Sequence, residues 1–164
     1  MLSKKVQKAI NDQINAELYS AYLYFSMSNW FKAQYLDGFA DWLKVQAGEE
    51  QGHAMRFYDY LHSKNAAVEL QAVAAPPKEW NSALAAFEDA YKHEKKITGM
   101  INKIGDLAVT EKDHATLVFL NWFFSEQVEE EESTLEMVEK LKMVASYPGG
   151  LYMLNKEAGS RDKK

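Results

Sequence analysis

The sequence contains no cysteine and few residues that interrupt regular structure. Without thiols, the 164-residue chain can form no disulfide, thiolate zinc site, iron–sulfur cluster or cysteine nucleophile. Its three prolines fall in two segments, at residues 76–77 and at 148, where two glycines follow. These two segments are therefore the expected breaks in an otherwise continuous pattern.

The sequence also lacks long apolar runs and dense basic blocks. No apolar run approaches the roughly 20 residues that a membrane-spanning helix needs. The 24 acidic residues outnumber the 19 basic ones, which argues against nucleic acid or an anionic membrane as a partner and is compatible with binding cations. No apolar stretch follows the early basic residues, so we expect no secretory signal and a cytoplasmic protein.

Between the breaks, the high content of Ala, Leu, Glu, Lys and Met favours helix almost throughout. We expect four long helices, over about 3–33, 37–64, 82–108 and from a turn at 109–114 to 146. A short fifth helix over about 149–158 and a frayed tail at 159–164 should follow. Ser3 and Asp37 are candidate N-caps, and Thr110 and Asp113 form a Thr-x-x-Asp capping pattern.

The connection through the prolines, some fifteen residues, is long enough to run from one end of a helical bundle to the other. We therefore expect an all-α fold, a four-helix bundle with one long crossover between the second and third helices and the short fifth helix at the end. The whole chain, 1–164, should form a single domain.

Each expected long helix carries ionisable or amide groups on its apolar stripe. Glu17, Glu50, Glu94 and the 126–130 segment lie near the midpoints of their helices, and midpoints share one layer of a bundle. Bare carboxylates in that layer would cost many kcal/mol. Two divalent cations would balance four carboxylates, with His53 as a neutral ligand, and this donor set suits iron or manganese, with zinc as a competitor.

An internal repeat links the two halves of this layer. Glu50 and His53 follow Glu17 by 33 and 36 positions, and the same offsets from Glu94 reach Gln127 and Glu130. The halves are therefore interpreted as degenerate copies of one helix pair. Because the second copy has exchanged Glu and His for Gln and Glu, we expect Glu50 as the bridging carboxylate and a more loosely held second metal.

Simpler interpretations exist for each motif alone. A single Glu-x-x-His pair more often lies on a helix surface, the acidic run 126–132 is typical of a solvated face, and aromatic residues such as Tyr24 are usually plain core. The other histidines, His62, His93 and His114, are expected at the surface. The coincidence of four midpoints with the repeated offset favours a metal site.

Four segments and the helix lengths resemble the non-haem bacterial and archaeal ferritins along nearly the whole chain. The segments are NDQINAELYSAYLYFSM, EEQGHAMRFYDYL, PPKEWN and KDHATLVFLNWFFSEQVEEE. The resemblance implies a hollow cage of 24 identical subunits that binds Fe(II) at a ferroxidase centre in each subunit. It further implies oxidation of that iron with O2 or peroxide, and storage of ferric mineral inside the cage.

The resemblance also implies a role for individual residues. A first iron site would comprise Glu17, Glu50 and His53, and a second Glu50 and Glu94, with Glu130 beside it and Gln127 as a hydrogen-bonding neighbour. A third site would use Glu49, Glu126, Glu129 and Glu130, and Tyr24 matches the tyrosine next to the centre.

Departures from related families indicate no haem. Bacterioferritins keep Glu and His where Gln127 and Glu130 stand, and use a Met for haem at the position of Gly52. Gly48 and Gly52 cost a helix about 1 kcal/mol each relative to Ala, and one hypothesis is that they loosen the helix beside the site.

Two other functions remain open. One is a di-iron oxidase or peroxidase whose iron stays bound while an organic substrate turns over, although the weak second site argues against it. The other is a non-enzymatic helical assembly with vestigial ligands, although the intact ligand set argues against that.

Overall fold

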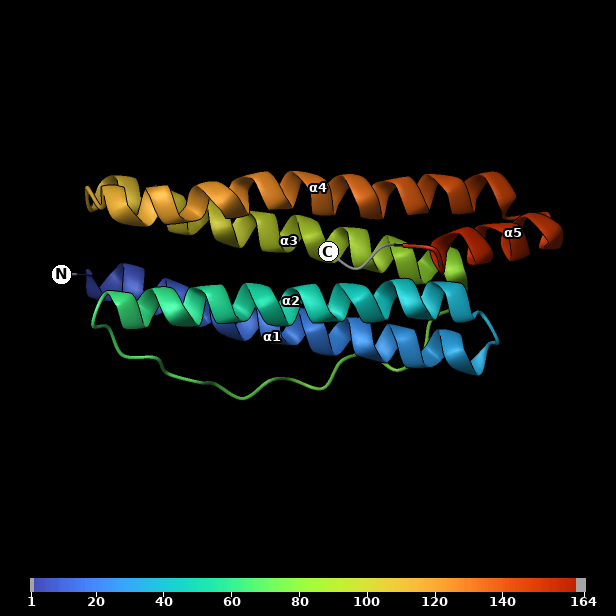
Figure 1. The fold of residues 1–164 in the computed structure, drawn as a ribbon, viewed down its shortest axis with the longest axis horizontal. Coiled ribbons are helices and arrows are strands. Elements are labelled where there is room, and N and C mark those ends of the chain that lie inside the picture. The colour runs from blue at the N-terminus through green and yellow to red at the C-terminus, as the bar shows by residue number, and fades with distance from the viewer. Residues whose placement is uncertain (1, 162–164) are drawn as a thin grey trace.

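The computed structural model describes residues 2–161, and these form five helices: α1 (Lys4–Ala33), α2 (Asp37–Ser63), α3 (Ala83–Thr110), α4 (His114–Val144) and α5 (Pro148–Ala158). The four long helices lie side by side, and α5 folds back against one end of the bundle (Figure 1). This confirms the expected all-α four-helix bundle with a short fifth helix. The assignment of the whole chain to one domain stays a prediction.

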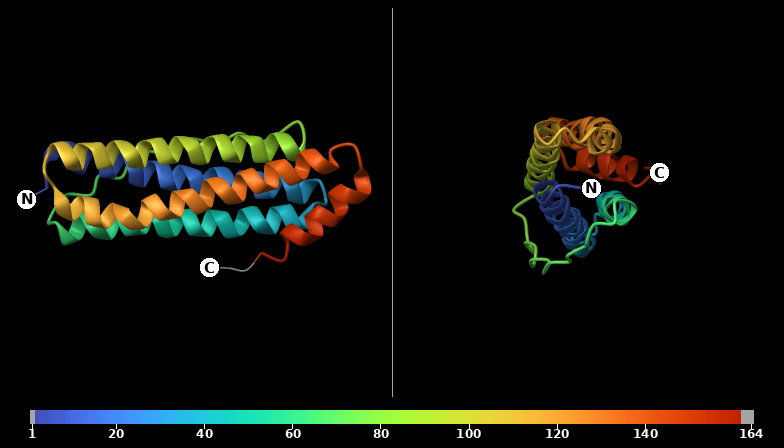
Figure 2. Two further views of the ribbon diagram at one scale, coloured as in Figure 1. Left: turned by 90° about the horizontal axis from the view of Figure 1, so that it is seen from above. Right: turned by 90° about the vertical axis from the view of Figure 1, so that its left-hand side faces the viewer.

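Two antiparallel hairpins make up the bundle. α1 packs most extensively against α2, and α3 against α4. The crossover 64–82 runs the length of the bundle, so that α2 and α3 point the same way (Figure 1), and the end-on view places it outside the four helices, next to α1 (Figure 2). No described helix is both long enough and apolar enough to cross a membrane.

Side-chain caps fix the starts of three helices. Ser3 accepts a hydrogen bond from the backbone N–H of Val6, at 3.3 Å, and Ser82 likewise begins α3. The expected cap at Asp37 is wrong, because Asp37 lies in the first turn of α2 and the preceding residue makes no side-chain cap. Thr110 ends α3 instead of belonging to the next cap, and Asp113 alone begins α4.

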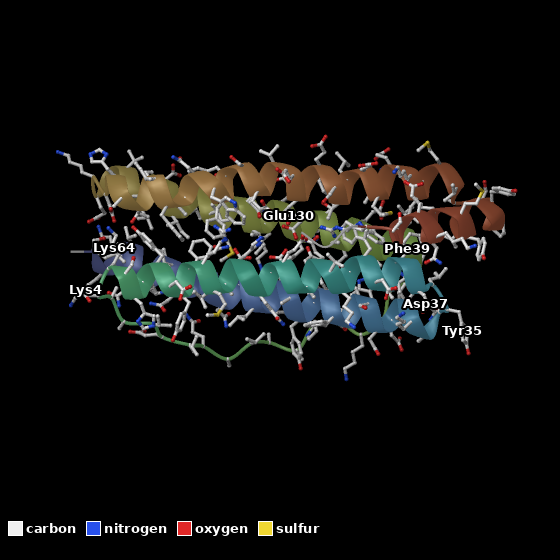
Figure 3. The ribbon with its side chains drawn as sticks, viewed as in Figure 1. Lys4, Tyr35, Asp37, Phe39, Lys64 and Glu130 are labelled. Atoms are coloured by element: carbon white, nitrogen blue, oxygen red, sulfur yellow. The ribbon has the colours of Figure 1, made fainter. Side chains whose placement is uncertain are left out.

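The first three helices end without glycine. Each is followed by a residue with positive φ, namely Tyr35 (59°), Asn65 (51°) and Lys112 (56°). The next backbone N–H then bonds to a carbonyl in the last helical turn, as in a Schellman motif; from Leu36 to Phe31 the distance is 3.0 Å. Tyr35 projects away from the bundle at the α1–α2 turn (Figure 3).

The apolar core is divided into two clusters by a polar layer. One cluster, toward α5, contains Phe31, Phe39 and Phe87, and the other, toward the opposite end, contains Phe57 and Phe123. The buried side chains of Glu17, Glu50, His53, Glu94, Gln127 and Glu130 lie between them. This arrangement agrees with the expectation that the midpoints of the helices share one layer.

A close backbone approach docks α5 onto α2. A side-chain Cβ on Gly38 would lie 1.6 Å from the carbonyl oxygen of Asn155, so only glycine fits there. The Asn155 side chain accepts a hydrogen bond from Phe39 N–H at 3.0 Å. This contact directs the residues after α5 back along α2.

The tail is not frayed at Arg161, contrary to expectation. Its guanidinium lies 4.2 Å from the ring centroid of Trp42 and donates a hydrogen bond to Glu49, at 2.7 Å. The remainder of the predicted tail, residues 162–164, lies outside the described residues.

The crossover is held along α1 by asparagines. Asn11 donates to the carbonyl oxygen of Ala67 at 3.1 Å and accepts from Glu69 N–H at 2.7 Å. One turn further on, Asn15 donates to the carbonyl oxygen of Ala72 at 3.1 Å. The crossover therefore has partners on α1 for part of its backbone, although it forms no helix.

Candidate metal centre

The predicted site residues meet at the middle of the bundle. Side chains from all four long helices are buried there: Glu17 and Tyr24 from α1, Glu50 and His53 from α2, Glu94 from α3, and Gln127 and Glu130 from α4. Glu130 lies about midway along the bundle, between α4 and α2 (Figure 3). The chain therefore concentrates ionisable groups where a bundle of this kind would otherwise be apolar.

One group of potential ligands comes from the first hairpin. Glu17, Glu50 and His53 each offer one ligand atom, and these atoms lie within 4.8 Å of one another. His53 Nδ1 lies 3.2 Å from Glu50 Oε2, because residues three apart share a helix face. Glu17 reaches the pair from α1, so one cation could bind to both helices.

A second group includes the acidic segment of α4. His53, Glu126 and Glu130 also offer ligand atoms within 4.8 Å of one another. Glu126 Oε1 lies 4.0 Å from His53 Nε2. His53 therefore lies between the two groups.

Glu94 is expected to bind the second iron, but its carboxylate is held by hydrogen bonds within the protein. The Tyr24 hydroxyl donates a hydrogen bond to one of its carboxylate oxygens. Gln127 Nε2 lies 3.3 Å from the other. Among residues 2–161, Glu94 joins neither group of potential ligands. A cation bound by Glu94 would have to replace at least one of these hydrogen bonds.

Two glutamines that the sequence interpretation did not assign to the site hold its carboxylates. Gln13 Nε2 donates to Glu17 at 2.8 Å, and Gln46 Nε2 donates to Glu50 at 2.9 Å and to Glu130 at 2.7 Å. Each glutamine stands four residues before a site glutamate, and the two are 33 positions apart, like those glutamates. That shared offset is the signal that could have identified them.

The unpaired atoms of the layer fit a cation. Glu17 Oε2 and Gln13 Oε1 are buried acceptors without a hydrogen-bond partner. A buried polar atom that loses its partner costs about 1–3 kcal/mol. A divalent cation would supply the missing partner for Glu17, and the surrounding set of carboxylates and one imidazole is suited to iron or manganese.

Three carboxyl groups have raised pKa values. Burial, followed by the charge of Glu50, raises the pKa of Glu17 well above its usual range. The same two causes act on Glu94, to which the charge of Glu130 adds. For Glu130, burial and then Glu50 raise the pKa to about 7. In the absence of a cation, these groups therefore bind protons at a higher pH than exposed glutamates do.

Glu50 and His53 behave as an ion pair. Burial acts to raise the pKa of Glu50, but the hydrogen bond and charge of His53 outweigh it and lower that pKa. Conversely, burial acts to lower the pKa of His53, and the hydrogen bond to Glu50 raises it to about 9. Binding a metal through His53 therefore requires the loss of a proton.

His93 is buried, contrary to the surface position expected for it. It is 8% exposed, and its Nε2 lies 2.7 Å from the hydroxyl of Ser20. Burial lowers its pKa to about 4, so the ring is neutral at physiological pH. His93 and the adjacent Glu94 both face inward because α1 covers this side of α3. His62 and His114 are exposed, as expected.

The four residues of the expected third site are not gathered into one group. Glu126 and Glu130 belong to the second group, whereas Glu49 pairs with Arg161 and Glu129 is exposed. Gly48 is also exposed and, with Glu49 and Arg161, lines an open groove of about 720 Å³.

Gly48 and Gly52 have no packing explanation. A Cβ atom at either position would meet nothing within 4 Å. No close approach therefore requires a glycine there, in contrast to Gly38.

Comparisons with known proteins agree with this fold. The sequence model of the ferritin-like domain matches residues 7–144. A bacterial non-heme ferritin from Campylobacter jejuni is 43% identical over 153 residues, which are 93% of this chain and 92% of that protein. A second, from Bacteroides fragilis, is 37% identical over 161 residues, 98% of this chain and all of its own.

Among solved structures, an open-pore ferritin of the archaeon Archaeoglobus fulgidus has a TM-score of 0.97 at 46% identity, covering 99% of this chain and 100% of that one. The match extends along both chains and is well above the identity at which only a fold would be shared. The chain therefore belongs to the ferritin family, and the resemblance found in the sequence is confirmed.

Proposed function

We propose that this protein stores iron. It binds Fe(II) at the buried centre, oxidises it with O2 or peroxide, and keeps the ferric mineral inside a hollow cytoplasmic cage of 24 identical subunits. The membership of the ferritin family and the buried layer of carboxylates support this proposal. The observation that carries it is the first group, in which a buried Glu17 oxygen without a partner faces the Glu50–His53 pair.

The chain's own residues would bind two Fe(II) ions as substrates. Glu17, Glu50 and His53 hold the first, and Glu50, Glu94 and Glu130 the second, with Glu50 between them. Gln127 is a neutral neighbour of the second position. The hydrogen bonds of Gln13 and Gln46 orient the carboxylates, and the two apolar clusters limit the access of water from either end.

The oxidation balances with O2 as the oxidant. Two Fe(II) ions lose one electron each, and O2 gains these two electrons and two protons to become H2O2. His53 and the carboxyl groups with raised pKa values release protons when cations bind, so protons are supplied within the site.

The second ion leaves first after oxidation, and the first ion must follow before two more Fe(II) ions can bind. Gln127 carries no charge, and Glu94 gives up hydrogen bonds to Tyr24 and Gln127 in order to bind iron. Both features weaken the second position relative to the first. Released Fe(III) then passes the acidic side chains of Glu49, Glu126 and Glu129, which offer anionic stations on its way to the cavity.

The test is to add excess Fe(II) in air, separate the protein by size exclusion and count iron per subunit in the protein peak. Storage predicts a large particle that carries far more than two irons per subunit. A count of about two would indicate a di-iron enzyme that retains its metal. No bound iron would indicate a helical assembly without a functional site.

A further inference from the structure

The chain's C-terminal region reaches the candidate metal centre through one arginine. Arg161 follows α5, and its side chain is 17% exposed where it lies over Trp42. Its Nη2 donates to Glu49 at 2.7 Å, and its Nη1 donates to Gln46 Oε1 at 2.9 Å. The close approach of Gly38 to Asn155 directs this segment along α2 and therefore places the guanidinium here.

Gln46 links this arginine to two carboxylates of the site. Its side chain is fully buried, and its Nε2 donates to Glu50 at 2.9 Å and to Glu130 at 2.7 Å. The two carboxylates come from different hairpins, because Glu50 is on α2 and Glu130 is on α4. One amide group thus holds a ligand from each half of the bundle.

The guanidinium determines which way this amide faces. An amide has an oxygen that only accepts and an NH2 group that only donates, whereas a guanidinium only donates. If the Gln46 amide turned over, its NH2 group would meet the Arg161 donors and its oxygen would meet two carboxylates. Both contacts would be unfavourable, so the observed orientation depends on Arg161 as well as on the carboxylates.

We propose that Arg161 is a positioning residue for the di-metal centre, acting through Gln46. By holding Gln46 Oε1, it keeps the amide N–H groups on Glu50 and Glu130 and keeps these carboxylates in the orientation that receives the second cation. This inference rests on the proposed function of the site, and it adds the segment after α5 to the machinery of that site.

Positioning and simple charge predict opposite effects. A positive charge near a cation site weakens cation binding, so its removal should tighten both positions if charge alone matters. Loss of positioning should instead weaken the second cation. Outer hydrogen-bond partners of metal ligands are typically worth about tenfold or more in affinity.

The experiment is an anaerobic calorimetric titration of the full-length protein with Fe(II). The parent should bind two ions per subunit in separate steps, and Arg161→Ala should weaken the second step about tenfold. The first step should weaken less, because Gln46 holds two ligands of the second position, Glu50 and Glu130, but only one of the first. Unchanged or tighter second-step binding in Arg161→Ala would overturn the inference. A parent protein that binds no Fe(II) would instead overturn the proposed function.

Two further variants distinguish positioning from loosened packing. Lys140 bridges Glu136 and Glu157, so it anchors α5 to α4 through contacts that do not involve Gln46. Lys140→Ala should therefore bind both ions as the parent does, and a tenfold loss in this variant would contradict the inference.

In a Gln46→Met background, Arg161→Ala should have little further effect, because the group through which it acts is gone. A full additional tenfold loss would show that Arg161 acts by another route.

Discussion

The two hairpins of the bundle carry their site residues at the same spacing but support them differently. In the α1–α2 hairpin, Gln13 and Gln46 stand one turn before Glu17 and Glu50 and donate to them. In the α3–α4 hairpin, 77 positions later, the corresponding residues are Ala90 and Phe123, which belong to the apolar clusters. The first hairpin therefore supplies both its potential metal ligands and the glutamines that donate hydrogen bonds to them.

The second hairpin relies on the first. Glu94 accepts one hydrogen bond from Tyr24 of α1 in addition to the one from Gln127, and Glu130 accepts from Gln46 of α2. The repeat itself extends to the turns, since Tyr35 and Lys112, both with positive φ, are also 77 positions apart. The hairpins thus share a backbone plan, and the loss of two glutamines and a histidine makes their chemistry unequal.

The largest effect is expected for the residue that both halves share. Glu50→Ala should abolish rapid Fe(II) oxidation, because Glu50 pairs with His53 and is the proposed bridge to the second position. Stopped-flow measurement in air would give the rate. The exposed neighbour Gln51 provides the control Gln51→Ala, which should behave as the parent. A parent-like rate for Glu50→Ala would show that the site is wrongly assigned.

In the metal-free protein, Glu130 of the second hairpin and His53 of the first should stabilise the fold over different pH ranges. The pKa of Glu130 rises from 4.5 to about 7 and that of His53 from 6.5 to about 9, so each stabilises the metal-free fold at low pH. The contribution of Glu130 is lost as pH rises through about 7, and that of His53 through about 9. Each is worth up to about 3 kcal/mol.

Thermal melts of the chelator-treated protein at pH 5, 7 and 9 would measure this loss. Glu130→Gln should lessen the decline between pH 5 and 7, to which Glu17 and Glu94 also contribute, and should retain the part between pH 7 and 9. A melting temperature that increased from pH 5 to pH 9 would contradict the sign of both shifts.

The difference in ligands between the two hairpins can be removed by introducing the Glu-x-x-His motif of α2 into α4. The double variant Gln127→Glu, Glu130→His leaves the net charge unchanged at pH 7 with His neutral, so any change reflects the ligands themselves. We expect the second cation to bind about tenfold more tightly in an anaerobic titration. Gln127→Glu alone should also tighten it. If the ratio of the two affinities stayed as in the parent, ligand identity would not explain the asymmetry.

The smallest effect concerns the glycines of α2, whose counterparts in α4 are Ser125 and Glu129. Because an added Cβ at Gly52 meets open space, Gly52→Ala should stabilise the fold by about 1 kcal/mol in thermal unfolding. If Gly52 loosens α2 beside the site, the same variant should slow oxidation or iron release. Unchanged rates would remove that role. Gly38→Ala, the matched control, should destabilise the protein because of the contact with Asn155.

Periodicity predicted the fold and the inward faces well. Glu17, Glu50 and His53 could be placed together because a helical stripe and a shared midpoint determine depth in a bundle. Periodicity along one helix does not show which neighbouring helix covers the residues beside its apolar stripe. The pattern therefore predicts His93 at the surface, although α1 covers it.

Other features depend on contacts between segments far apart in sequence. Glu94 turns toward Tyr24, which no spacing along α3 encodes. Arg161 reaches Glu49 because α5 packs onto α2 at Gly38, so a local interpretation of the tail as frayed could not succeed. The missed cap at Asp37 shows likewise that a favourable residue type near a helix start does not determine the hydrogen bond.

The crossover held by Asn11 and Asn15 also has a consequence for assembly of the bundle during folding. Each hairpin brings together helices that adjoin in sequence, so each can form through short-range contacts. The tether between them makes their docking intramolecular, at an effective concentration in the millimolar range that a flexible linker typically provides. Once the asparagines bind part of that tether to α1, fewer of its residues remain flexible. The second hairpin then explores a smaller volume around the first before it docks.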